Sequence, residues 1–202
     1  MLIIHYTGMV SAEAALDRLC DPASEVSAHY LIDEDGTTWR LVPEDRRAWH
    51  AGRAFWAGET DINSRSIGIE LANPGHEHGY RPFPDAQMKA LERLCRDILS
   101  RFPIPSHLVL GHADVAPGRK HDPGELFDWQ RLAAAGIGLW PDDRPFDLSD
   151  FADDMRRFGY ENDSAEAVAA FQLHFRPSDV TGIQDDETRT RLRNLIIRAG
   201  LA

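Results

Sequence analysis

Two histidines and an aspartate occupy positions in the sequence from which they could hold one metal ion. His112 ends an apolar run, and a loop rich in Pro and Gly then leads to Asp122, ten positions further on. A loop this constrained can turn the carboxylate back towards the imidazole. His5 closes another short apolar run near the beginning of the sequence. Zinc hydrolases use three protein ligands and leave the fourth position to water or substrate, so these residues are candidate zinc ligands.

A zinc ion in such a site would promote hydrolysis. Bound zinc lowers the pKa of its water to about 7 and polarises the carbonyl group under attack. The spacing alone also leaves a structural role open. The chain has nine histidines, and a His/His/Asp set found by motif matching is more often structural than metal-binding.

The elements that must carry these residues alternate between strands and helices. Apolar positions in steps of three, four and seven over residues 85–102 predict an amphipathic helix, and Ser11 is a suitable N-cap for an earlier one. Short apolar or alternating runs predict strands at residues 2–6, 29–33, 37–42, 66–71 and 107–111. This alternation predicts an α/β domain with a central mixed β-sheet flanked by helices, and functional residues at the strand ends.

A change of composition divides the chain into two predicted domains. Residues 136–146 combine glycines, prolines and charged residues, and we interpret them as a linker that follows an α/β domain of residues 1–135. Residues 147–202 form the second domain. Their apolar spacing predicts a small all-α, three-helix domain, with helices at residues 148–158, 164–175 and 185–199.

The composition restricts the class of partner. Apolar residues make up 43% and charged residues 27% of the chain, which is ordinary for a globular protein. Lys and Arg number 22 against 33 Asp and Glu, for a net charge of −11. This balance argues against a nucleic acid partner, because phosphate backbones are bound through clustered Lys and Arg. No apolar run approaches the ~20 residues of a membrane span, so no membrane span is expected.

The two cysteines and the first residues bear on the cellular compartment. Cys20 and Cys95 lie in two separate helical patterns, so buried free thiols are expected rather than a disulfide. The sequence opens directly on a predicted strand, with no basic leader. We expect a periplasmic or cell-envelope location if a leader is missing from this chain, and the cytoplasm otherwise. The sequence does not fix the oligomeric state, and a monomer is favoured.

Five segments, in this order, resemble the zinc N-acetylmuramoyl-L-alanine amidases, the family that shares its fold with phage lysozyme-like amidases and peptidoglycan recognition proteins. The resemblance covers nearly all of residues 1–132. The matching segments are Ile3-Ile4-His5-Tyr6-Thr7, Ser27-Ala28-His29-Tyr30-Leu31-Ile32, Ala48-Trp49-His50-Ala51-Gly52, Ser66-Ile67-Gly68-Ile69-Glu70, and Gly111-His112 through Asp122-Pro123-Gly124.

The resemblance implies a role for each matching chemical group. His5, His112 and Asp122 would be the ligands of Zn2+. Glu70 would be the general base that takes a proton from the zinc-bound water, and Lys120 would stabilise the oxyanion. The structural alternatives are a salt bridge for Glu70 and a solvated loop charge for Lys120. Glu70 interrupts an apolar strand, where a lone carboxylate is costly to bury, and this favours the functional role.

Substrate contacts are expected from a Trp- and Gly-rich loop over residues 48–63 and from polar residues around it. The candidate substrate-binding residues are His29, Trp49, His50, Trp56 and Asn73. The alternative for the two histidines is a hydrogen-bonded structural role, and the alternative for the two tryptophans is a place in the core. His78 and His121 are expected to be exposed polar residues.

The C-terminal segment resembles the three-helix peptidoglycan-binding module, with matches at residues 155–160, 167–175 and 182–188. The two resemblances together imply hydrolysis of the amide between N-acetylmuramic acid, or its anhydro form, and L-alanine in peptidoglycan or muropeptides. The alternatives are a recognition protein that binds muropeptides without cutting them, and a zinc amidase that acts on another acyl–amino bond. Non-catalytic members of the family typically lack part of the metal set, which is complete here, so the enzyme is favoured.

Overall fold

The computed structural model describes residues 1–142 and 150–202. In these ranges the strands are β1 (Leu2–Tyr6), β2 (Tyr30–Ile32), β3 (Thr38–Arg40), β4 (Ile67–Leu71) and β5 (Val109–Gly111). The α-helices are α1 (Ala12–Cys20), α2 (Gly75–His78), α3 (Asp85–Arg101), α4 (His112–Val115), α5 (Trp129–Ala134), α6 (Phe151–Phe158), α7 (Ala165–Phe175) and α8 (Asp186–Arg198). None of the helices in these ranges is both long and apolar enough to cross a membrane.

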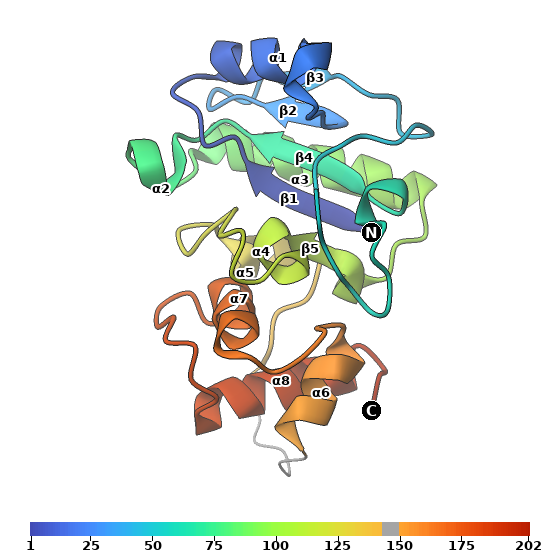
Figure 1. The fold of residues 1–202 in the computed structure, drawn as a ribbon, viewed down its shortest axis with the longest axis vertical. Helices are drawn as coiled ribbons and strands as arrows, with labels where there is room; N and C mark the ends of the chain where they lie inside the picture. Colours follow the sequence, from blue (N-terminus) through green and yellow to red (C-terminus); the bar gives the residue numbers. More distant parts are fainter. Residues whose placement is uncertain (143–149) are drawn as a thin grey trace.

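The five strands form one mixed sheet, in the order β3-β2-β4-β1-β5 (Figure 1). β1 pairs in parallel with both β4 and β5, β2 pairs in parallel with β4, and β3 closes the edge as the antiparallel arm of a hairpin with β2. The predicted α/β fold with a central mixed sheet flanked by helices is therefore confirmed. Because β1 and β4 run in the same direction, their C-terminal ends meet at one edge of the sheet.

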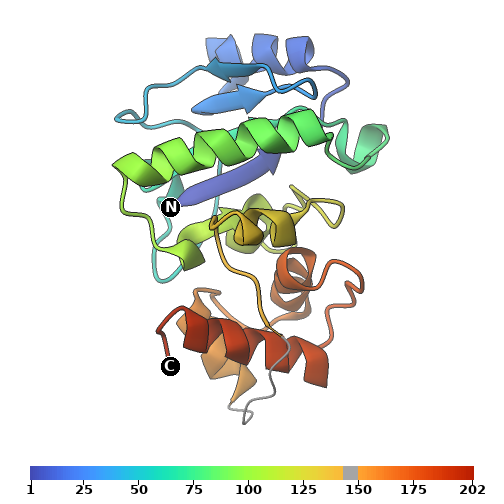
Figure 2. The ribbon, with the colours of Figure 1, turned by 180° about the vertical axis from the view of Figure 1, so that it is seen from behind.

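One face of the sheet is covered by α3, which runs in front of the sheet and alongside β1 in Figure 2. Alternate residues of the strands point to this face, so Leu2, Ile4 and Ile69 pack with the apolar side of α3 in one buried cluster. The intervening residues of β1, Ile3 and His5, face the opposite way. Side-chain alternation therefore places the first candidate ligand on the face that α3 leaves open.

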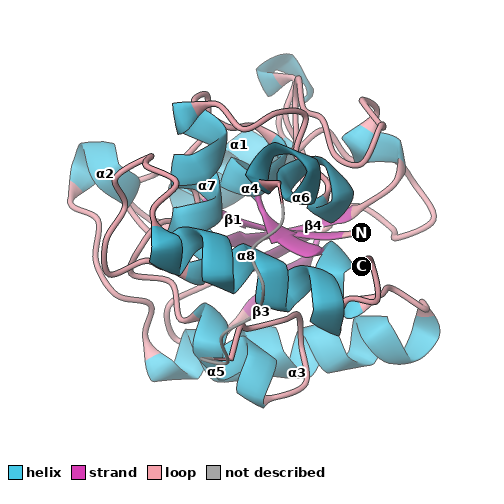
Figure 3. Cartoon of the chain, turned by 90° about the horizontal axis from the view of Figure 1, so that it is seen from below, coloured by secondary structure: helices cyan, strands magenta, loops and turns pink. Residues whose placement is uncertain are grey.

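The C-terminal helices α6, α7 and α8 lie beyond the β5 edge of the sheet (Figure 1), so they overlap the sheet in the view from below (Figure 3). Their apolar residues form one buried cluster together with apolar residues of the α/β domain, and α7 packs on α4. This shared cluster contains Ile3, Trp56, Leu110, Phe158 and Phe171, all at most 2% exposed. The helices and the α/β domain therefore bury apolar surface against each other, as two parts of one core.

Several boundaries differ from the sequence prediction. Residues 107 and 108, predicted as the start of a strand, belong to a 3-10 helix (Ser106–Leu108) that precedes β5. The loop expected after His112 begins with a short helix, α4, which its Pro and Gly content did not predict. Within the predicted linker, Ile137 is buried and the Asp142 amide donates to Asn194 Oδ1. The rest of the predicted linker, residues 143–146, and the predicted helix start at Leu148 lie outside the described residues.

Both cysteines are free thiols, as predicted, but the prediction that both are buried is wrong for Cys20. Cys95 lies inside α3 and is fully buried, whereas Cys20 is exposed. The physical reason is its position as the last residue of α1, beyond the residues that this helix buries against the sheet, Ala12 and Ala15.

Candidate metal centre and active site

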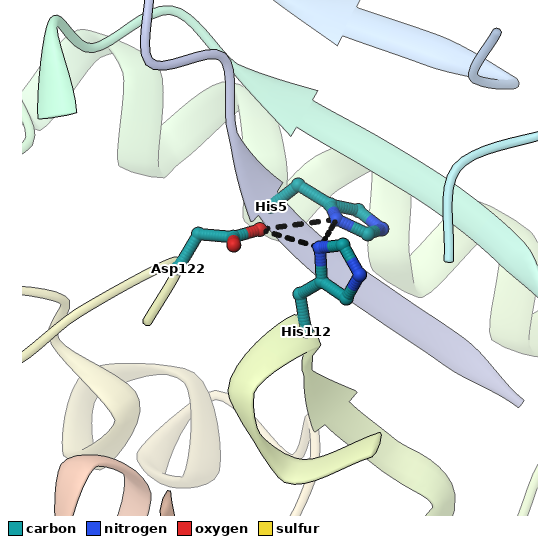
Figure 4. A group of neighbouring side chains, drawn as sticks. All are labelled: His5, His112 and Asp122. Atoms are coloured by element: carbon teal, nitrogen blue, oxygen red, sulfur yellow. Dashed lines mark hydrogen bonds and ion pairs between the residues drawn. The ribbon is translucent and has the colours of Figure 1, made fainter. Parts of the chain in front are cut away.

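Three candidate ligand atoms meet at the C-terminal end of β1 (Figure 4). His5 Nδ1 and His112 Nδ1 are 3.0 Å apart, and Asp122 Oδ2 lies 3.1 Å from the first and 3.0 Å from the second. All three residues are at most 5% exposed. Tetrahedral zinc with bonds of about 2.0–2.1 Å separates its ligand atoms by roughly 3.3 Å, so these side chains are spaced to hold one such ion.

The backbone explains how distant residues reach one point. His5 lies on β1, and His112 begins α4 directly after β5, which pairs with β1 in parallel. The loop that follows α4 returns Asp122, because the Ala113 amide donates to the Asp122 carbonyl oxygen at 2.9 Å. The turn that the Pro- and Gly-rich sequence predicted is thus made by a backbone hydrogen bond.

The remaining nitrogen of each imidazole has a partner that frees Nδ1 for a metal. His112 Nε2 donates to the Ala51 carbonyl oxygen at 3.0 Å. His5 Nε2 lies 3.0 Å from His50 Nδ1, and His50 Nε2 lies 3.2 Å from Ser66 Oγ, which donates to the Ile62 carbonyl oxygen. Because the Ile62 carbonyl oxygen can only accept, Ser66 accepts from His50 Nε2, and His50 Nδ1 accepts from His5 Nε2. The Nδ1 atoms of His5 and His112 therefore carry free lone pairs.

The electrostatics also suit a zinc ion. Burial, and then the neighbouring His112, lower the pKa of His5 to about 4, and burial lowers the pKa of His50 well below its usual value. Burial alone would raise the pKa of Asp122, but its charge interactions and hydrogen bonds with His112 and His5 outweigh burial and hold that pKa low. At neutral pH His5 is therefore a neutral imidazole and Asp122 a carboxylate, which are the donor states that zinc requires.

The cluster opens into a cleft of about 560 Å³. Two of its three candidate ligands, His112 and Asp122, line the cleft directly, together with Glu70 and Lys120. Three protein ligands with access to solvent leave room for a water or a substrate oxygen, which is the pattern of a catalytic rather than a structural zinc site. The cleft therefore brings Glu70 and Lys120 together with two of the three candidate ligands.

Glu70 is the direct register partner of His5 across β1 and β4. Its Oε2 atom is buried and has no hydrogen-bond partner among the described residues. Burial, and then the charge of Asp122, raise the pKa of Glu70 well above its usual value, while Lys120 opposes this shift. An unpaired carboxyl group with a raised pKa beside a metal site is suited to accept and return a proton near neutral pH.

The predicted substrate-binding residues divide into two groups. Trp49, which is 50% exposed, and His50 both line the cleft. Trp49 is therefore available to a substrate. His50, with both ring nitrogens in the hydrogen bonds described above, instead supports the ring of His5. The structural alternative that the sequence left open for His50 thus agrees with its contacts.

The other three predicted substrate-binding residues are not on the cleft wall. His29 is fully buried, where its Nδ1 accepts from the Gly68 amide and its Nε2 donates to the Arg46 carbonyl oxygen. Asn73 holds the turn before α2, with Oδ1 accepting from the Gly75 amide. Both residues therefore satisfy backbone groups and lie away from the cleft wall.

Trp56 also lies away from the cleft. It is 1% exposed and packs edge-on against Tyr160 and Phe158 of the C-terminal helical region, with ring centroids 4.8 and 5.9 Å away. The Gly-rich loop that suggested a binding rim instead delivers this tryptophan into the shared core. The sequence could not show this, because the residues that cover Trp56 lie a hundred positions further along the chain.

Some residues of the cleft were missed by the sequence analysis. Tyr6 and His76 line it and face each other, with Tyr6 Oη 2.9 Å from His76 Nδ1. Arg119 also lines it and donates to the carbonyl oxygens of Ala51 and Arg53. The positions of Tyr6 beside His5 and of Arg119 beside Lys120 were the available signals. His121, expected only to be exposed, is exposed and lines the cleft as well.

Comparison with known proteins identifies the family. Residues 1–125 match the family model described as N-acetylmuramoyl-L-alanine amidase. The chain is 38% identical to N-acetylmuramoyl-L-alanine amidase AmiD of Escherichia coli (strain K12), over 99% of this chain and 83% of that protein.

Two solved structures resemble the whole chain. One is AmiD from E. coli in complex with the substrate anhydro-N-acetylmuramic acid-L-Ala-D-gamma-Glu-L-Lys, with a TM-score of 0.88 at 38% identity, over 100% of this chain and 90% of that one. The other is AMPDH3 from Pseudomonas aeruginosa in complex with anhydromuramic pentapeptide, with a TM-score of 0.87 at 33% identity, over 98% of this chain and 91% of that one. This chain belongs to the N-acetylmuramoyl-L-alanine amidase family.

Proposed function

We propose that this chain is a zinc-dependent amidase that hydrolyses the bond between N-acetylmuramic acid, or its anhydro form, and L-alanine. The observation that carries the proposal is the meeting of His5, His112 and Asp122 beside a cleft that Glu70 and Lys120 also line. The ligands held by the two solved relatives, both anhydromuramic acid joined to a peptide, support this class of substrate.

Each residue around the cluster has a separate role in amide hydrolysis. A zinc ion held by His5, His112 and Asp122 would supply an activated water and polarise the carbonyl group. Glu70 accepts the proton of the attacking water and passes it to the nitrogen of the leaving L-alanine, which completes the cleavage. The Lys120 ammonium group stabilises the negative charge that develops on the carbonyl oxygen. His50 fixes the ring of His5, and Trp49 offers an exposed aromatic face to the substrate.

The proposal is tested by zinc stoichiometry and product analysis on purified anhydro-muropeptide, for the wild type and for Asp122→Ala. We expect one zinc per wild-type chain and release of the free L-alanyl peptide by the wild type alone. Zinc without cleavage would contradict the proposed substrate and favour a recognition protein. A wild-type chain that binds no zinc would contradict the ligand set itself.

A further inference from the structure

A buried carboxylate joins the C-terminal helices to the metal centre. Asp114 is 1% exposed and accepts three hydrogen bonds. Its Oδ1 atom accepts from Tyr160 Oη at 2.6 Å, and its Oδ2 atom accepts from His174 Nδ1 and from the Gly111 amide, each at 2.7 Å. Two of the three donors thus come from beyond residue 150. A buried carboxylate depends on such partners, because an uncompensated charge is costly in the interior.

The two donors from the C-terminal region are held rigidly. His174 lies on α7 and is stacked between Trp129 and Phe175, with ring centroids 3.7 and 3.8 Å away. Tyr160 follows α6, is 2% exposed, and packs edge-on against Trp56. Because packed aromatic rings leave neither donor room to turn, the position of Asp114 is set by the way the C-terminal helices dock.

Asp114 in turn sets the backbone on both sides of His112. Its carboxylate holds the Gly111 amide at the point where β5 becomes α4, and His112 lies between these two residues. The next amide, that of Ala113, holds the Asp122 carbonyl oxygen. A shift of Asp114 therefore moves the backbone of one candidate ligand and, through α4, the loop that carries another.

We propose that Tyr160 and His174 are positioning residues for the metal centre, acting through Asp114 on His112 and Asp122. The inference rests on the proposed zinc site and adds to it a role for the C-terminal helices. Through Asp114, these helices help to hold His112 and Asp122 in position. Partners of this kind typically change metal affinity about 10- to 100-fold when they are removed.

The test compares zinc affinity, by competition with a chromophoric chelator, across variants of the full chain. Tyr160→Phe removes one hydrogen bond and keeps the ring, and His174→Leu removes another. His174→Asn is the conservative rescue, because its amide nitrogen can take the place of Nδ1. Thr188→Val is the matched control: Thr188 is fully buried within the C-terminal helices, where its hydroxyl accepts from Gln172, and it makes no contact with Asp114.

We expect Tyr160→Phe and His174→Leu to weaken zinc binding about 10-fold or more. The visible absorption spectrum of the cobalt-substituted protein should change with them. His174→Asn should bind zinc nearly as the wild type does. Thr188→Val should lower the melting temperature and leave both zinc affinity and the cobalt spectrum unchanged.

The inference is overturned if Tyr160→Phe binds zinc within two-fold of the wild type with the same cobalt spectrum. It is equally overturned if Thr188→Val loses zinc affinity to the same extent, because the effect would then be one of general stability. Tyr160→Phe decides the question even if His174→Leu does not fold, since it is close in shape to the wild type. A wild type without zinc would refute the proposed function itself, which is a distinguishable result.

Discussion

His5 and Glu70 are direct partners in the parallel register of β1 and β4. Paired residues of neighbouring strands point to the same face of a sheet, so the imidazole and the carboxyl group leave the sheet side by side. The same alternation sends Ile4 and Ile69 to the opposite face, under α3. The register of two strands thus places a candidate metal ligand next to the candidate base, and five predictions follow from the arrangement around this pair.

Glu70→Gln should reduce turnover about 10²- to 10⁴-fold, because the amide cannot accept a proton from water. The variant should still hold one zinc per chain, since Glu70 is not among the three clustered ligands. Peptide release from anhydro-muropeptide and metal content measured on the same preparation check this. Activity within a few-fold of the wild type would show that another group is the base.

The rate of hydrolysis should begin to fall, as the pH is lowered, at a higher pH than it would if the base had the pKa of an ordinary carboxylate. Glu70 must be ionised to act as base, and its pKa is raised, so activity is present above that pKa and is lost as the pH falls through it. Protonation of His5, whose pKa is about 4, comes only at lower pH. A pH–rate profile with zinc content measured at each point checks this. Loss of zinc in step with the rate would assign the acid limb to the ligands instead.

Lys120→Met should lower kcat about 10²- to 10³-fold and change KM little, because a cation that faces the oxyanion acts mainly in the transition state. Steady-state kinetics on the same muropeptide provide the measurement. Lys89→Met is the matched control, since Lys89 is exposed and pairs with Asp85 on α3. A change confined to KM would make Lys120 a substrate-binding residue.

His50→Ala should weaken zinc binding about 10- to 100-fold, because His5 Nε2 would lose its acceptor. His50→Asn should recover much of the affinity, since its side-chain oxygen can accept in place of Nδ1. His78→Ala, at an exposed position at the end of α2, should have no effect. Zinc competition titrations distinguish these outcomes. Unchanged affinity in His50→Ala would remove His50 from the support of the site.

The two tryptophans of the Gly-rich loop should respond in opposite ways. Trp56→Ala should lower the free energy of unfolding by about 3–5 kcal/mol, because it empties a fully packed position in the shared core. Trp49→Ala should change that free energy by less than about 0.5 kcal/mol, as exposed positions do, and raise KM. Denaturant unfolding and steady-state kinetics on both variants check this. A raised KM with unchanged stability in Trp56→Ala would instead support a substrate contact for Trp56.

The sequence predicted those features of the structure that depend on neighbouring residues. Alternation over residues 66–71 and the spacing over residues 85–102 predicted β4 and α3 to within a residue or so. The strand ahead of His112 and the turn towards Asp122 were visible too. The order of the segments predicted the family, which the comparisons confirm.

Contacts between distant segments decided which of the candidate residues are exposed, buried or hydrogen-bonded. Nothing local distinguishes Trp49 from Trp56, yet one is exposed at the cleft and the other is covered by residues near position 160. The hydrogen bonds of His29 and His50 likewise depend on strands and loops that meet only in the folded chain. The sequence by itself determined which residues could do the chemistry and which elements carry them, because secondary structure follows from neighbouring residues. Only the tertiary structure decided which polar residues face the cleft and that Asp114 ties it to the C-terminal helices, because burial and hydrogen bonding depend on contacts between distant segments.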